Sequence, residues 1–370
     1  TVYSHIYFDL RKEPIYIKKP ASDRYNTLEL IDAYGDYIEI LGTGFTGGDG
    51  ETEAVLTGPD YKGEIPDDIH VIHSPTNDLW GFIRILSRTN DNGDYGNIRK
   101  IQDGYEVRPF SSRNKTYVQP DGIYHPENDF VPFEKLNQLS TEEVFAIFNR
   151  NIQANPGKNY DKELLESVAA YGIGQGKTFI LKNLPEPVRD EVAAFYERMI
   201  KEFANTRYGY LVGDWMLSYP SIADFKKNYM FRANIAWGGA GANPVEMAIY
   251  PSHLLETGED TVVHFFERPA VRIEEGGFWS ISIYGLNKFI IPNEIDRFGL
   301  NDRSDLVYNE DGSFDIFIQK NRPEGEMERN WLPNAGQPSL IVLRFYLPTE
   351  QLLKDEWKYP DILEKDHQKS

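Results

Sequence analysis

Carboxylates among apolar residues are the side chains of this sequence best suited to proton transfer. Asp9 and Asp32 each end a strand-like apolar stretch, and Glu246 lies among apolar neighbours of its own. A carboxyl group in such surroundings can have a raised pKa, which suits it to act as a general acid or base. The competing interpretation, and the commoner arrangement, is a carboxylate that binds turn amides or pairs with an arginine. Both interpretations stay open.

Aromatic side chains form the second set of candidates. Tryptophan and tyrosine rings stack on sugars or apolar rings in a ligand site, and they also fill cores. A core position is favoured for most of the set, which comprises Trp237, Tyr250, Trp279 and Tyr284. Trp331 differs, because the string 330–333 has no hydrophobic periodicity and is flanked by polar residues.

A glycine-rich string at 172–178 is the most tempting nucleotide-binding motif. A phosphate-binding loop needs a first glycine separated by four residues from its Gly-Lys-Thr, and it follows a strand. Tyr171 occupies that position, and the preceding residues 164–170 are helix-like. Glycines that end a helix are therefore the better explanation.

The sequence gives little support for a metal site and none for thiol chemistry. The chain has no cysteine, which excludes disulfides, thiolate zinc sites and a cysteine nucleophile. His70 and His73 are the only close histidine pair, and no carboxylate lies at metalloprotease spacing from them. We predict no metal site, and the sequence names no cofactor.

Composition limits the partners. Asp and Glu number 58 against 39 Lys and Arg, which gives a formal charge of −19. Such a surface repels phosphate backbones and anionic lipids, and no local basic patch offsets it. No apolar run approaches the roughly 18 residues of a membrane span. We therefore expect neither nucleic-acid binding nor a membrane span.

The elements that position these residues fall into three blocks. Residues 1–110 consist of short strand-like stretches between glycine-rich turns, which predict an antiparallel β-sandwich domain. Residues 111–230 contain a polar linker and helices, the first of them opened by a capping box at Ser140 and Glu143. Residues 231–370 return to strand patterns. The predicted fold is mainly β with a helical insert (α+β), because no alternating βαβ series is present.

Short motifs follow one another in order through both β blocks. They are Tyr3-Ser4, Asp23-Arg24-Tyr25, Asp32-Ala33-Tyr34, Gly42-Thr43, Ser74-Pro75-Thr76-Asn77, Arg232-Ala233, Gly241-Ala242-Asn243-Pro244, Phe278-Trp279-Ser280, Asp302-Arg303-Ser304 and Asn330-Trp331-Leu332-Pro333. Taken together the chain resembles a two-domain family of uncharacterised proteins, domain of unknown function 1254 followed by domain of unknown function 1214. The resemblance implies a β-sandwich, a helical connection and a jelly-roll-like second domain, often in an oligomer. It implies no established reaction.

The leading functional hypothesis is an enzyme that acts on a small neutral or cationic molecule in a cleft between the two β domains. Pockets favour domain interfaces, and the non-periodic polar strings of both halves would converge there. The candidate catalytic residues are Asp32 and Glu246 as acid or base, with Arg303 and Asn330 as orienting donors. The candidate ligand-binding residues are Tyr3, Asp9, Tyr34, Tyr250, Trp279, Tyr284 and Trp331.

Two alternatives remain open: a glycan- or polymer-binding surface protein of jelly-roll type, and a structural oligomer without a ligand. We also expect a homo-oligomer. The chain opens inside a strand-like segment, which predicts an upstream segment, and many proteins of the family that it resembles are exported. A periplasmic or extracellular location is therefore expected.

Overall fold

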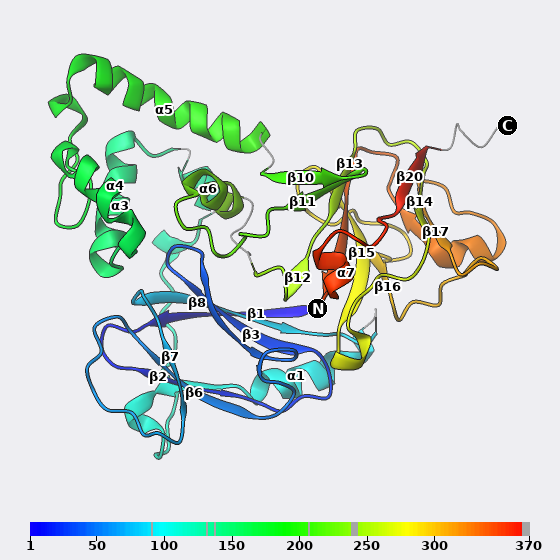
Figure 1. The fold of residues 1–370 in the computed structure, drawn as a ribbon, viewed down its shortest axis with the longest axis horizontal. Helices are drawn as coiled ribbons and strands as arrows, with labels where there is room; N and C mark the ends of the chain where they lie inside the picture. The colour runs from blue at the N-terminus through cyan, green and yellow to red at the C-terminus, as the bar shows by residue number, and fades with distance from the viewer. Residues whose placement is uncertain (90–91, 131, 137, 206–207, 238–242, 365–370) are drawn as a thin grey trace. The chain divides into compact units, whose positions relative to one another are not determined.

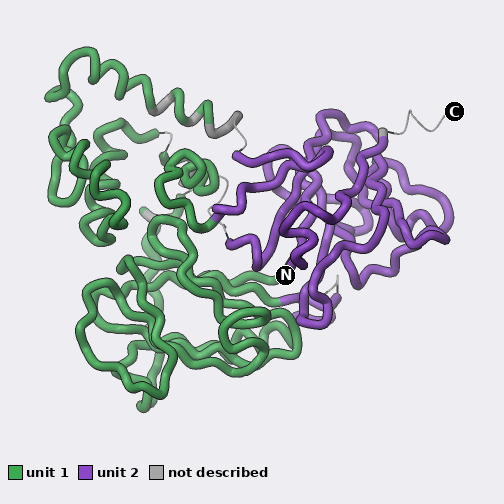
Figure 2. Tube along the Cα trace, viewed as in Figure 1, with its two compact units in different colours: residues 1–85, 97–207, 223–242 green, residues 86–96, 208–222, 243–370 purple. Residues whose placement is uncertain are grey.

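Two β-rich units divide the chain in the computed structural model. Unit 1 comprises residues 1–85, 97–207 and 223–242, and unit 2 comprises residues 86–96, 208–222 and 243–370 (Figure 2). The structure describes every residue except 90–91, 131, 137, 206–207, 238–242 and 365–370 (Figure 1). The predicted mainly β fold with helices is confirmed.

The described residues of unit 1 form two sheets, with strand orders β1-β8-β3-β4-β5 and β7-β6-β2-β9. Side chains alternate along β1, where Tyr3, His5 and Tyr7 are exposed and Phe8 is buried, as expected for a strand with one solvated face. Both sheets contribute to one core, for example through Leu28 and Ile17. The strands are β1 (Val2–Asp9), β2 (Ile15–Lys19), β3 (Asn26–Asp32), β4 (Tyr37–Gly42), β5 (Thr46–Gly47), β6 (Thr52–Thr57), β7 (His70–His73), β8 (Asp78–Ile85) and β9 (Glu106–Pro109).

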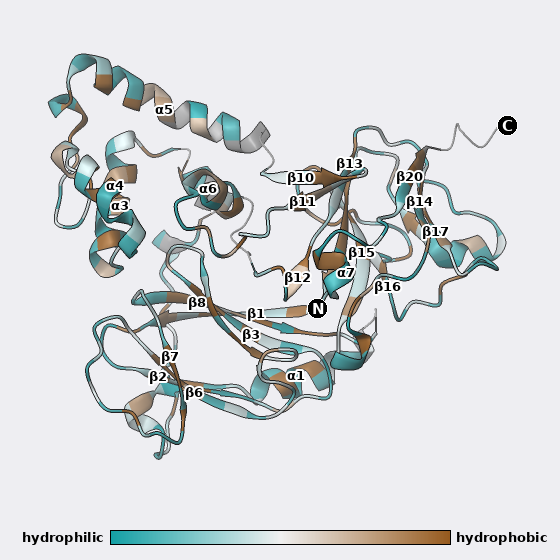
Figure 3. Ribbon diagram, viewed as in Figure 1, coloured by the Kyte–Doolittle hydropathy of each residue, from teal (hydrophilic) through white to brown (hydrophobic). Residues whose placement is uncertain are grey.

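Four of the helices named below, α2 to α5, lie in the chain between the strands of unit 1 and those of unit 2. The predicted capping box is confirmed: the Ser140 side chain accepts from the Glu143 amide, and the Glu143 side chain accepts from the Ser140 amide at 2.8 Å. The helix that it opens is longer than the apolar stretch 141–148 that suggested it. Hydrophobic and hydrophilic residues intermix along the longest helix, α5 (Figure 3). The helices are α1 (Tyr95–Asp103), α2 (Pro132–Leu136), α3 (Thr141–Ala154), α4 (Lys162–Val168), α5 (Glu186–Asn205), α6 (Tyr229–Trp237) and α7 (Glu350–Leu353).

The glycine-rich string 172–178 ends a helical segment, as predicted. Gly172 has φ of +81°, and a Cβ there would lie 2.3 Å from the carbonyl oxygen of Thr178. The Asn149 side chain of α3 fixes the loop: it donates to the Gly172 and Lys177 carbonyls at 3.0 Å and accepts from the Gly174 amide at 2.7 Å. The loop is therefore held by a side chain of its own unit, which occupies the Gly174 amide as well as two carbonyls.

Unit 2 contains two further sheets among its described residues. One has the order β10-β11-β13-β19-β15-β16, with β12 paired to β19, and the other has the order β18-β17-β14-β20. Phe265, Trp279 and Phe314 pack together in the core. The strands are β10 (Gly209–Val212), β11 (Trp215–Ser218), β12 (Ala248–Ile249), β13 (Ser252–Leu255), β14 (Thr261–Phe265), β15 (Phe278–Gly285), β16 (Gly299–Asn301), β17 (Phe314–Gln319), β18 (Trp331–Pro333), β19 (Ser339–Tyr346) and β20 (Asp361–Glu364).

Across the described parts of the chain, no helix is both long enough and apolar enough to cross a bilayer.

Candidate binding site

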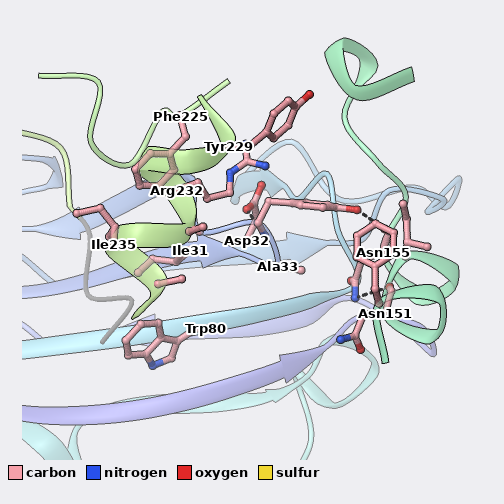
Figure 4. A pocket seen from close by; sticks show the side chains of 16 residues that line it. Ile31, Asp32, Ala33, Trp80, Asn151, Asn155, Phe225, Tyr229, Arg232 and Ile235 are labelled. Atoms are coloured by element: carbon pink, nitrogen blue, oxygen red, sulfur yellow. Dashed lines mark hydrogen bonds between the residues drawn. The ribbon is translucent and has the colours of Figure 1, made fainter. Parts of the chain in front are cut away.

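A cavity of about 420 Å³ lies within unit 1. It is bounded by the turn between β3 and β4, by Trp80 of β8, by the C-terminal half of α3 and by α6 with the preceding Phe225 (Figure 4). Pockets that hold small molecules typically measure about 300–1,000 Å³. The cavity is therefore large enough for a small ligand.

The β3–β4 turn is shaped by Asp32. Its Oδ1 accepts from the backbone amides of Tyr34 at 2.8 Å and Asp36 at 3.1 Å. The amide of Gly35, whose φ is +82°, donates to the Asp32 carbonyl at 3.0 Å. An aspartate that binds the amides after it is a common way to close a turn, and glycine adopts a positive φ without steric cost.

The second oxygen of Asp32 is bonded to Lys158. Oδ2 accepts from the Lys158 Nζ, which also lies 3.4 Å from Asp36 Oδ2. The Asp32 side chain is 0% exposed. Burial raises the pKa of Asp32 above the usual aspartate value, and Lys158 opposes that shift. Both carboxylate oxygens are thus satisfied within the protein.

Arg232 of α6 forms the polar end of the cavity. Its Nη2 donates to the Tyr160 hydroxyl at 3.2 Å and to the Lys226 carbonyl at 3.0 Å, and it lies 3.7 Å from Asp36 Oδ2. The Arg232 Nε is buried and has no hydrogen-bond partner within the described structure. A buried donor without a partner costs about 1–3 kcal/mol, so the folded protein keeps an unsatisfied donor on a side chain that lines the cavity.

Aromatic rings enclose the same guanidinium. Its central carbon lies 5.7 Å from the ring centres of Tyr34 and Tyr229 and 5.9 Å from that of Phe225. Contacts at these distances are attractive because ring faces carry negative charge density. They hold Arg232 at the cavity wall (Figure 4).

The other polar side chains at the wall bond back into the protein. The Tyr34 hydroxyl donates to the Asn155 carbonyl at 2.8 Å, and burial raises the pKa of Tyr34 to about 12. The Tyr229 hydroxyl donates to Asp161 at 2.8 Å. Asn155 Oδ1 accepts from the Asp78 amide at 2.8 Å. Arg232 and the exposed Asn151 are the remaining lining residues with polar side chains.

Apolar side chains make up most of the remaining wall, and the most extended of them is Trp80. Its Nε1 donates to His5 Nδ1 at 3.1 Å, and its indole stacks on the rings of His5 and Phe82. The indole is thereby fixed in place. The other apolar lining residues are Ile31, Ala33, Phe148, Ile152, Phe225, Ala233, Ile235 and Ala236.

Four of the predicted site residues lie in unit 1. The structure places Asp32 and Tyr34 together at the cavity. Tyr3 is exposed and stacks on Phe82. Asp9 is exposed, and a hydrogen bond from Arg11 lowers its pKa.

Three of the predicted site residues in unit 2 lie in its interior. Asn330 is 3% exposed, accepts from the Val307 amide and donates to the Val307 and Asp315 carbonyls at 2.8–2.9 Å. Trp331 is buried, and its Nε1 donates to the Gln319 carbonyl at 2.8 Å. Trp279 belongs to the core.

The other four lie nearer the surface of unit 2. Glu246 is exposed. Arg303 pairs with Asp302 at 2.6 Å, and burial raises the pKa of that aspartate. The Tyr284 hydroxyl accepts from Arg344 at 2.7 Å. The Tyr250 hydroxyl donates to Asn243 at 2.8 Å, and Tyr250 lines a small cavity of about 40 Å³.

Sequence reasoning assigned no role to Lys158, Arg232, Trp80 or Asn151. One signal for Arg232 was present, because Phe225, Tyr229 and Arg232 follow one another at helical spacings of four and three. Lys158 carries no comparable local pattern. No group of three or more His, Asp or Glu side chains able to hold a metal occurs in the described part of the chain.

Comparison with known proteins matches two segments of the chain to families of unknown function. The model for "Protein of unknown function (DUF1254)" matches residues 1–109, and the model for "Protein of unknown function (DUF1214)" matches residues 255–350. A search of curated proteins finds no match.

Among solved structures, the VPA0106 protein from Vibrio parahaemolyticus is similar with a TM-score of 0.70 and 20% identity, over 98% of this chain and 88% of that one. An uncharacterised protein from Burkholderia cenocepacia matches with a TM-score of 0.44 and 12% identity, over 98% of this chain and 76% of that one. The Vibrio likeness shows a shared fold.

Proposed function

Because the chain belongs to the family in which a DUF1254 domain is followed by a DUF1214 domain, whose name carries no activity, we propose its function from the geometry of the cavity. Unit 1 binds a small, uncharged and largely apolar molecule that offers a hydrogen-bond acceptor to Arg232. The observation that carries the proposal is Arg232, a guanidinium donor among the lining residues of an otherwise mainly apolar cavity, whose Nε has no hydrogen-bond partner within the described structure.

The charges around the cavity favour an uncharged ligand. Lys158 and Arg232 face the carboxylates of Asp32 and Asp36, and Asp161 adds a further acid behind Tyr229. The positive charge of the arginine is therefore already balanced, and an anionic ligand would gain little from it. A carbonyl, ether or hydroxyl oxygen meets the same donor without bringing a charge into apolar surroundings.

The geometry of the cavity makes Asp32 a weaker candidate for an enzyme's acid or base than the sequence suggested. Asp32 has the raised pKa expected of an acid or base, yet its carboxylate is enclosed and bonded to Lys158. Proton transfer to a ligand would require Asp32 to leave Lys158, whereas Arg232 can polarise an acceptor where it stands. Binding is thus supported more directly than catalysis, and in catalysis Arg232 would be the residue that touches the reacting group.

The glycan alternative is less well supported at this cavity. A sugar ring presents several hydroxyl groups, each of which needs a polar partner when it is buried. The polar wall residues Tyr34, Asn155 and Tyr229 are bonded within the protein instead. The cavity therefore suits a molecule with few polar groups.

Calorimetric titration with two nearly isosteric probes, acetophenone and ethylbenzene, tests the proposal. The ketone oxygen should improve affinity about tenfold or more, the value of a hydrogen bond to a charged donor. Arg232→Met should remove that preference. The matched control is Arg99→Met, which makes the same change at a side chain of unit 1 that is 75% exposed.

Two outcomes would overturn the proposal: neither probe binds saturably, or ethylbenzene binds the wild type as tightly as acetophenone does. The second comparison needs no variant and stands even where Arg232→Met fails to fold.

A further inference from the structure

A second cavity, of about 460 Å³, lies in unit 1 where its two sheets end. β1 is the end strand of one sheet and β9 is the end strand of the other, and residues of both strands line this cavity. Gln102 of α1 lines it too, as do Tyr117 and Gln119 from the segment that follows β9. The cavity shares no lining residue with the one that Arg232 lines. It is therefore a separate site, and its volume is in the range of small-molecule pockets.

Part of the wall of this second cavity is apolar. Ile83 of β8 belongs to the core of unit 1, and Ile6 of β1 and Val107 of β9 pack against that core. All three also line the cavity. Ile6 and Val107 are only half-buried, so part of their apolar surface stays open to a ligand.

Polar side chains with unused hydrogen-bonding capacity line the same cavity. Gln102 Nε2 donates to Ser4 Oγ at 2.9 Å, and its amide oxygen accepts from no described residue. The side chains of Tyr117 and Gln119 make no hydrogen bond within the part of the chain that the structure describes. Gln102 and Tyr117 are half-buried and Gln119 is exposed, so a ligand can reach them. Amide and hydroxyl groups of this kind both donate and accept.

The charged side chains at the cavity balance one another. Arg108 Nη2 lies 3.0 Å from Glu106 Oε2, and Lys18 Nζ lies 3.9 Å from Glu106 Oε1. An anionic ligand would face Glu106 and a chain with a net charge of −19, whereas a cationic one would face Arg108 and Lys18. An uncharged ligand meets neither repulsion.

From this combination we propose that the cavity at β1 and β9 binds a neutral saccharide unit. A pyranose ring has apolar C–H faces and several hydroxyl groups, each of which both donates and accepts. It therefore needs apolar contact and several unoccupied polar partners at the same site. Ile6 and Val107 supply the first, and Gln102, Tyr117 and Gln119 supply the second. The proposal is independent of the ligand of the other cavity, because no residue is shared.

A glycan array tests the proposal with the wild-type protein. Multimerising the biotinylated protein on streptavidin makes weak binding detectable through avidity. The array carries glycan pairs that differ only in a carboxylate or sulfate group. We expect neutral glycans to be bound and their acidic counterparts to be bound more weakly. Binding of no glycan, or of acidic glycans alone, overturns the proposal, and neither result depends on a variant.

Variants then locate the bound saccharide. The neutral glycan that gives the strongest array signal is titrated by calorimetry. Gln102→Leu and Tyr117→Leu should each weaken its binding about three- to tenfold, the loss expected for one hydrogen bond or one ring contact. The matched controls are Gln153→Leu, at an exposed glutamine of α3, and Tyr7→Leu, at an exposed tyrosine of β1, and both should keep the wild-type affinity. Unchanged affinity in either test variant, or an equal loss in its control, overturns the assignment to this cavity.

Discussion

Replacement of Lys158 by methionine removes the cation that faces two buried carboxylates. The Lys158 side chain is 15% exposed, and those of Asp32 and Asp36 are 0% and 9% exposed. Methionine keeps a similar chain length but leaves both acids without this partner. Breaking one side of a buried ion pair costs about 3–5 kcal/mol, and solvent screening is small at this burial. We expect Lys158→Met to lower the free energy of unfolding of unit 1 by that amount at neutral pH.

The loss should depend on pH. Burial raises the pKa of Asp32 in the folded protein and Lys158 lowers it, so the pKa rises further in the variant. A carboxyl group with a raised folded-state pKa binds its proton more tightly when folded, so its contribution is fully present below the unfolded pKa and is lost as pH rises through the folded pKa. The destabilisation by Lys158→Met should therefore be small below about pH 4 and grow toward neutral pH.

Hydrogen exchange in increasing urea, read on peptides from β3 and β8, measures this loss for unit 1 alone. The matched control is Lys162→Met, four residues along the chain, where the lysine is 78% exposed and 3.9 Å from Glu166. We expect it to change stability by no more than about 0.5 kcal/mol. A loss for Lys158→Met as small as that of the control, or one that is the same at pH 4 and pH 7, would refute the reasoning.

Four further substitutions, one of them a matched control, test single features by urea denaturation. Asn155→Ala removes the acceptor for two backbone amides at the start of β8 and should destabilise unit 1 by about 2–3 kcal/mol. A loss of stability below about 1 kcal/mol, the value of one ordinary hydrogen bond, would contradict this expectation. Gly42→Ala places a Cβ 2.1 Å from the Asn26 carbonyl oxygen at φ of +127° and should lower the free energy of unfolding by more than about 3 kcal/mol. The matched control is Gly312→Ala, with open surroundings at φ of +87°, which should lower it by about 1 kcal/mol. Equal losses of stability in the two variants would contradict the steric explanation. Trp331→Ala should cost about 3–5 kcal/mol in unit 2 and leave ketone binding by unit 1 intact; lost binding would reassign Trp331 to the ligand site.

Features that depend on residues close together in the chain could be predicted from the sequence. Ser140 and Glu143 satisfy each other's backbone amides within four residues, so the helix start is visible in the sequence. Gly172 marks a helix end because its backbone is left-handed, with φ of +81°, which glycine adopts without steric cost. Asp32 could be identified as a buried acid because its apolar neighbours belong to a strand that is buried along its whole length.

Contacts between residues that are distant in the chain could not be predicted from such local patterns. Lys158 is 126 residues from Asp32, and no local signal indicates that they meet. Trp80 gains its place in the cavity wall from stacking across two strands, which depends on the register of β1 and β8. The non-periodic string of Asn330 and Trp331 has a structural explanation as well, because both side chains bond to backbone groups inside unit 2.

The location of a bound probe tests the proposed binding site most directly. Crystals grown with 4′-bromoacetophenone allow the bromine to be placed by its anomalous scattering. We predict one bromine position inside the cavity of unit 1 that Arg232 lines, with the ketone oxygen within hydrogen-bond distance of the Arg232 guanidinium. An empty cavity with bromine bound elsewhere, or a ketone oxygen turned away from Arg232, would contradict it.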